Sequence, residues 1–111
     1  MQGYDREKAV QYMLAHWDPK LLRGMKARLP EWLRSFIEYD LHFMRLTGVV
    51  DENGCQGENE YDDDEAFEYI YDAWLSDHPE DGDETMKVAE ALNIYMELQY
   101  DFLVSEGLAE L

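Results

Sequence analysis

Apolar residues recur along most of the chain at the spacing of an α-helix. Between Val10 and Trp17 they fall at i, i+3, i+4 and i+7, which predicts a first helix over residues 6–16. Asp5 is placed to cap the start of this helix. An Asp-Pro pair follows, and because proline suits the first helical position, it predicts a short second helix over residues 18–28.

A broader apolar stripe predicts a third helix, which starts at Pro30 and stops at Gly48. The stripe comprises Trp32, Leu33, Phe36, Ile37, Leu41 and Met44. Polar residues dominate the region around residues 48–60, where a loop is expected. The Asn-Gly pair at positions 53–54 favours a tight turn, so a short hairpin within this loop is an open alternative.

The cleanest periodicity lies over residues 63–76, where apolar doublets recur every four residues and predict a fourth helix. The doublets are Ala66/Phe67, Ile70/Tyr71 and Trp74/Leu75. After a polar connector, a fifth helix is predicted over residues 84–105, and Gly107 closes it. Its apolar face consists of Val88, Leu92, Tyr95, Leu98 and Phe102. We therefore expect one domain over residues 1–111, an all-α compact bundle of four to five helices.

The net charge changes the picture, because it is large and unevenly distributed. The chain of 111 residues has a formal net charge of −17. Residues 1–47 carry eight Lys/Arg and six Asp/Glu, whereas residues 48–111 carry one Lys and twenty Asp/Glu. Such a field repels nucleic acid and anionic membranes and attracts basic proteins. We expect a basic protein partner, no direct nucleic-acid binding and no membrane binding.

Linear motifs for catalysis or metal binding fail in this sequence. An EF-hand that starts at Asp51 has Cys55 and Gln56 at its fifth and sixth positions, where Asp/Asn and Gly are needed. No Glu-x-x-His pair, nucleophile–base pair or glycine-rich phosphate loop is present, and the lone Cys55 excludes an internal disulfide. We predict no catalytic residues, no metal site and no cofactor, and we do not expect an enzyme. The N-terminus lacks the apolar core of a signal peptide, so a cytoplasmic setting is expected.

The predicted fourth helix concentrates the acids. Asp64, Glu68 and Asp72 fall at i, i+4 and i+8, so they form one stripe of carboxylates. Acids in the first turn are favoured by the helix dipole, which accounts for the Asp cluster at 62–64. Glu68 and Asp72 lie beyond the first turn, so the dipole does not account for them. Their like-charge i, i+4 spacing even costs about 0.2–0.5 kcal/mol for each pair. We therefore predict a binding surface for a strongly basic partner; a solvated face that serves solubility is the alternative.

The predicted contact residues lie at the end of the loop and on the predicted fourth helix, which we call the acidic helix. Two of them, Tyr61 and Tyr69, would either stack on arginine side chains of the partner or pack at the core or rim. The set comprises Glu58, Glu60, Tyr61, Asp62, Asp63, Asp64, Glu65, Glu68, Tyr69 and Asp72.

Residues 60–67, EYDDDEAF, resemble the acidic, aromatic-flanked segment of some small anti-CRISPR proteins. Those proteins block RNA-guided nucleases by occupying the basic site that reads the PAM. The resemblance implies DNA mimicry, and with it an inhibitor of a nuclease or CRISPR effector, of phage or mobile-element origin. Two alternatives remain open: an immunity protein that neutralises a basic toxin, and a small carboxylate- or metal-dependent enzyme.

Overall fold

The computed structural model of the chain describes residues 3–21, 23–50 and 60–108. These residues form four α-helices and two short 3₁₀ helices. In chain order they are α1 (Arg6–Ala15), η1 (Arg23–Met25), α2 (Leu29–Leu46), α3 (Asp63–Asp77), η2 (Pro79–Glu84) and α4 (Thr85–Ser105). The all-α prediction is confirmed, with four α-helices in the described part of the chain rather than four to five. The possible hairpin at positions 53–54 lies outside the described residues.

The predicted second helix is wrong. Turns and the single 3₁₀ turn of η1 connect α1 to α2 instead. The Asp18 carboxylate accepts a hydrogen bond from the Lys20 backbone N–H at 2.9 Å, as a capping aspartate would, but turns and not a helix follow it. Trp17 and Met25 are both buried, but Leu21 between them is exposed, so the described residues of this segment form no continuous apolar face. A helix here would also have contained Gly24, which weakens helices.

The ends of the other helices follow the sequence signals. The Asp5 carboxylate accepts from the Lys8 backbone N–H at 3.0 Å and caps α1. Gly48 after α2 and Gly107 after α4 have positive φ angles of 78° and 73°, the left-handed conformation that closes a helix. The predicted bounds of α3 and α4 differ from the observed ones by only one residue.

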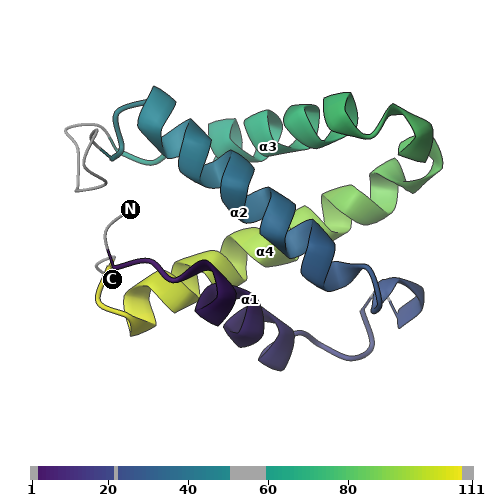
Figure 1. Cartoon of the computed structure of the whole chain (residues 1–111), viewed down its shortest axis with the longest axis horizontal. Coiled ribbons are helices and arrows are strands. Elements are labelled where there is room, and N and C mark those ends of the chain that lie inside the picture. Colours follow the sequence, from purple (N-terminus) through teal and green to yellow (C-terminus); the bar gives the residue numbers. More distant parts are fainter. Residues whose placement is uncertain (1–2, 22, 51–59, 109–111) are drawn as a thin grey trace.

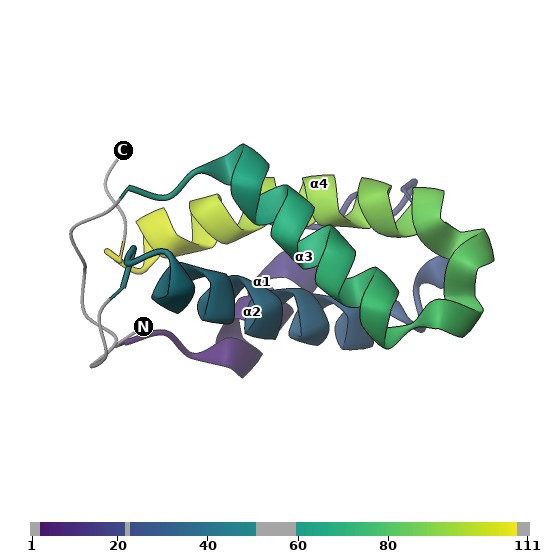
Figure 2. The same ribbon diagram turned by 90° about the horizontal axis from the view of Figure 1, so that it is seen from above.

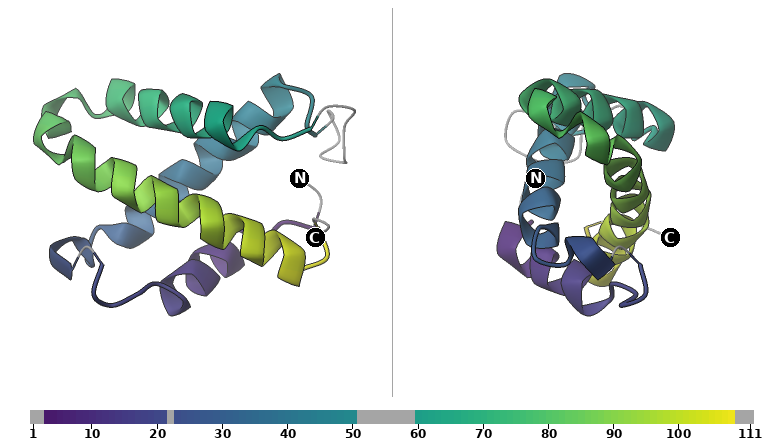
Figure 3. Two further views of the ribbon diagram at one scale, coloured as in Figure 1. Left: turned by 180° about the vertical axis from the view of Figure 1, so that it is seen from behind. Right: turned by 90° about the vertical axis from the view of Figure 1, so that its right-hand side faces the viewer.

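The helices α2 and α4 cross in the middle of the molecule, and α1 and α3 lie on opposite sides of that pair (Figure 1). The view from above shows α3 passing obliquely over α2 (Figure 2). At one end η2 joins α3 to α4, and from there the two helices separate toward the N-terminus of α3 (Figure 3). This divergence sets the shape of the surface between α3 and α4.

The core is built largely from the predicted faces. Every apolar residue of the predicted α2 stripe is buried, and so are Ala66, Ile70 and Trp74 of the α3 doublets. The second residue of each doublet is half-buried and lies at the edge of the core. On α4 the predicted Leu98 is half-buried, whereas Gln99 is only 4% exposed. Asp40, in the middle of the α2 stripe, is 0% exposed.

No helix among the described residues is both long enough and apolar enough to cross a membrane.

Replacing Gly107 by alanine tests the closing turn of α4. A Cβ atom there would meet nothing within 4 Å, so the cost is conformational, about 1 kcal/mol of the free energy of unfolding. Gly82→Ala is the matched control, because its Cβ also meets nothing and its φ is not in the left-handed region. That variant should be neutral or more stable by roughly 0.5 kcal/mol. Urea denaturation measures the free energy of unfolding of both variants. Equal effects of the two substitutions would contradict the left-handed closing turn at Gly107.

Candidate functional site

The carboxylates of the acidic helix all face solvent. The exposed residues are Asp62, Asp63, Asp64, Glu65, Glu68 and Asp72. Asp62 also caps α3, because its Oδ1 accepts from the backbone N–H groups of Asp64 at 3.0 Å and Glu65 at 3.1 Å. The first-turn acids therefore have the structural role expected at a helix N-terminus. Glu68 and Asp72 lie beyond the first turn and have no such role.

An open groove with a volume of about 690 Å³ lies between the N-terminal half of α3 and α4. We call it the α3–α4 groove. It is lined by Asp63, Asp64, Phe67 and Glu68 of α3 and by Asn93, Met96, Glu97 and Tyr100 of α4. The lining combines four carboxylates with aromatic and thioether side chains and includes no Lys or Arg. Asp72, the last acid of the predicted stripe, is exposed but does not line the groove.

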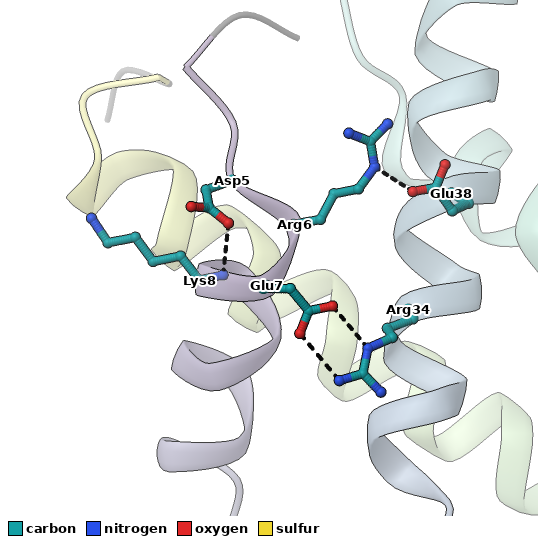
Figure 4. Close-up of polar contacts among 6 residues, drawn as sticks. All are labelled: Asp5, Arg6, Glu7, Lys8, Arg34 and Glu38. Carbon is teal, nitrogen blue, oxygen red and sulfur yellow. Dashed lines mark hydrogen bonds and ion pairs between the residues drawn. The ribbon is translucent and has the colours of Figure 1, made fainter.

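Four cations of the N-terminal half pair with acids on other elements. Arg6 of α1 contacts Glu38 of α2. In the same interface, Arg34 donates two hydrogen bonds to the Glu7 carboxylate at 3.0 and 3.1 Å (Figure 4). Such paired hydrogen bonds fix the orientation of both groups. These contacts tie α1 to α2, on the side of the molecule away from α3.

Two further ion pairs also join residues of different elements. Lys8 pairs with Glu106 at 2.6 Å, and Arg28 pairs with Glu84. Within the described part of the chain, no carboxylate of α3 forms an ion pair with Lys, Arg or His. The ion pairs of the described residues therefore all join acids outside α3.

The two tyrosines among the predicted contact residues pack inward. The rings of Tyr61 and Tyr69 lie 6.1 Å and 5.4 Å from the ring of Phe43 on α2. Both side chains are half-buried, and neither lines the α3–α4 groove. Their rings therefore stabilise the contact of α3 and its preceding segment with α2. That they also stack on arginines of a partner stays a prediction.

A buried carboxylate holds the chain segment that leads into α3. Asp40 of α2 accepts hydrogen bonds from the hydroxyls of Tyr61 and Tyr95, each at 2.7 Å. On α4, Gln99 lies beside it and accepts from the Tyr4 hydroxyl at 2.8 Å. We call Asp40, Tyr61, Tyr95, Gln99 and Tyr4 the Asp40 cluster. It joins α2, α4, the N-terminal segment and the start of the acidic helix.

Burial raises the pKa of Asp40 from 3.8 to about 6. The hydrogen bonds from Tyr95 and Tyr61 oppose that rise in pKa, and the nearby Gln99 amide opposes it too. The amide nitrogen of Gln99, Nε2, forms no hydrogen bond of normal geometry among the described residues. The charge of Asp63 at the start of α3 raises the pKa further. Burial and the Asp40 charge likewise raise the pKa values of Tyr61 and Tyr95.

Sequence reasoning missed the α4 side of the site and the Asp40 cluster. Asn93, Glu97 and Tyr100 follow i, i+4 and i+7, so a search for exposed stripes would have found them on one face of α4. Of the predicted contact residues, Glu60 is exposed at the entry to α3, and Glu58 lies outside the described residues.

The histidines lie at helix ends or against aromatic rings. Nδ1 of His16 is 2.8 Å from the Tyr12 carbonyl oxygen, and Nδ1 of His78 is 2.9 Å from the Trp74 carbonyl oxygen. These contacts agree with the C-terminal capping role of histidine. His42 lies over the ring of Tyr69, with centroids 6.2 Å apart. Among the residues that the structure describes, no group of three or more His, Cys, Asp or Glu side chains has the arrangement of a metal site.

Comparison of the chain with protein-family models, with curated proteins and with solved structures finds no match.

The pKa of Asp40 predicts a specific pH dependence of stability. Because its pKa is higher in the folded chain than in the unfolded chain, the folded state binds the proton more tightly. Stability from this group therefore rises as the pH falls through 6 toward 4. Between pH 8 and pH 5 the gain is about 1 kcal/mol, which Asp40→Asn should remove.

Urea denaturation of both proteins at pH 5, 6, 7 and 8 measures the effect. The difference between the two profiles isolates Asp40 from the other acids, which titrate in both proteins. Parallel profiles across this range would show that Asp40 titrates as an ordinary surface carboxylate.

Proposed function

We propose that this protein is an acidic interaction module that binds a basic protein. In its specific form, the module is a DNA-mimicking inhibitor that occludes the nucleic-acid site of a nuclease or CRISPR effector. The observation that carries the proposal is the exposed α3 carboxylates, which form no ion pair in the described structure, although other acids of the chain do. Solubility alone is served equally well by interspersed charges of both signs.

Electrostatic repulsion within the free protein favours binding. Asp64, Glu68 and Asp72 follow each other at four-residue intervals, about 6 Å apart along the helix axis. Each neighbouring pair costs about 0.2–0.5 kcal/mol in the isolated helix. A cationic partner relieves this repulsion, and bidentate arginine–carboxylate pairs would add orientation.

Mimicry of DNA follows from the kind of surface that the partner must have. Duplex DNA carries one charge per about 1.7 Å of axis, so the proteins that bind it line their sites with Lys and Arg. A rigid helix that presents carboxylates can occupy such a site in place of phosphates. The Asp40 cluster supports this role, because it fixes the N-terminal end of α3 to α2 and α4.

The experiment captures partners from a bacterial lysate on the immobilised protein and elutes them with increasing salt. Nucleic-acid-binding proteins should elute as the salt screens the contact. Each captured protein is then tested for duplex binding with and without the acidic protein. A DNA mimic competes with the duplex, whereas an immunity protein that binds beside the DNA site leaves duplex binding intact. Capture of neutral or acidic proteins alone would refute the proposal.

Charge reversal of the stripe gives the corresponding variant. Asp64→Lys, Glu68→Lys and Asp72→Lys together should abolish partner capture. The stability of the fold should change little, because three lysines at i, i+4 and i+8 repel one another about as much as the acids that they replace. Thermal melting by circular dichroism checks the fold, and pull-down checks the binding.

A matched control separates the site from the net charge. Glu31→Lys, Glu80→Lys and Asp101→Lys change the net charge by the same amount at exposed positions outside α3. This control should retain most of the binding. If both triple variants weaken capture equally, the interaction depends only on net charge and α3 is not the contact surface.

A further inference from the structure

The α3–α4 groove is more than a cluster of acids, because its lining is partly apolar. Phe67 stacks on Tyr71 with ring centroids 6.1 Å apart and is half-buried. Met96 is half-buried too, with its sulfur 3.9 Å from the Tyr61 hydroxyl. Tyr100 is 47% exposed, so part of its ring is accessible at the groove. A ligand in this groove would therefore bury apolar surface as well as charge.

On each wall of the groove, polar side chains recur once per turn of helix. Asp64 and Glu68 lie one turn apart on α3, and Asn93 and Glu97 lie one turn apart on α4. One turn of helix rises about 5.4 Å, so side chains one turn apart on a bound helix would meet successive polar groups of each wall. A helix laid beside two others packs at interaxial distances of about 8–10 Å.

We propose that the α3–α4 groove is the docking site for an amphipathic basic helix of the protein partner. An apolar side chain of that helix packs against Phe67, Met96 and Tyr100. Arginine or lysine side chains one turn away pair with the carboxylates of Asp63, Asp64, Glu68 and Glu97. This inference rests on the proposed function and narrows it to one groove and one kind of partner segment.

The chemistry of the groove argues against the other occupants. A nucleic acid or an anionic membrane would bring more negative charge to four carboxylates. A second copy of the chain, with its net charge of −17, would be repelled for the same reason. A basic helix neutralises the carboxylates, and its apolar face covers the aromatic and thioether groups that water solvates poorly.

Two synthetic peptides of equal length and equal positive charge test the proposal. Both are designed as helices with arginines on one face. The first carries leucines on the other face, and the second carries glutamines there, which have a similar helix propensity. Fluorescence anisotropy at physiological salt should show that the leucine peptide binds at least tenfold more tightly. Equal affinity of the two peptides would overturn the groove proposal.

A bulky substitution in the groove then localises the binding. Asn93→Trp fills the groove without changing the charge, and Gln11→Trp is the matched control on the exposed face of α1. Asn93→Trp should weaken the binding of the leucine peptide at least tenfold and that of the glutamine peptide less than twofold. Gln11→Trp should change neither. Equal effects of the two substitutions would place the binding outside the groove.

The outcomes separate this inference from the proposed function. Binding of both peptides with equal affinity and strong salt dependence overturns the groove and leaves the acidic interaction module standing. Binding of neither peptide overturns both. Melting temperatures establish that the variants fold. If Asn93→Trp does not fold, Met96→Gln carries the test, because it removes apolar surface from the groove with a side chain of similar length. It should abolish the preference for leucine.

Discussion

Asp40 places a carboxylate, 0% exposed, at a point where four parts of the chain meet. Two tyrosine hydroxyls donate to it, one from α4 and one from the segment that leads into α3. Removing the carboxylate would leave these donors in the core without their acceptor, at about 1–3 kcal/mol each. Keeping it costs the desolvation that raises its pKa to about 6. The position of the acidic helix relative to α2 and α4 depends on this balance.

The distribution of charge has a second physical basis in the ion pairs. Arg6, Arg34 and Lys8 bind acids of α1, α2 and the end of α4, so they stabilise the half of the bundle away from α3. Exposed pairs of this kind contribute little to stability, because water and salt screen them. For the surface, the main consequence of these pairs is that they neutralise acids outside α3 and leave the α3 carboxylates without an ion pair among the described residues. The acidic helix keeps its negative field, and the divergence of α3 from α4 opens a groove beside it.

The sequence predicted the parts of the fold that local patterns determine. The α3 doublets and the α2 stripe defined buried faces because each repeats at the helical period over several turns. The second helix was wrong, because an Asp-Pro start without a continuous apolar face does not sustain a helix. Asp40 was missed although its position in the α2 stripe, four residues after Phe36 and four before Met44, marks it as buried. An acid at such a position signals a buried polar cluster, and the cluster partners depend on the fold.

The site was predictable on only one of its two sides. The α3 carboxylates were predicted as exposed, and they are, since the apolar doublets fix which face of the helix turns to the core. Phe67, the second residue of its doublet, lies at the core edge and lines the same groove as Asp64 and Glu68. The contribution of α4 depends on the angle between two helices. That angle is set by η2 and the packing on α2, and no local pattern encodes it.

Backbone chemical shifts during a titration with the leucine-bearing basic peptide test the central claim most directly. If the acidic helix and the groove beside it form the binding surface, the amides of residues 63–68 and 93–100 should shift most. The exposed face of α1 should remain unchanged. Shifts spread evenly over all acidic parts of the surface, or centred on another element, would contradict the account.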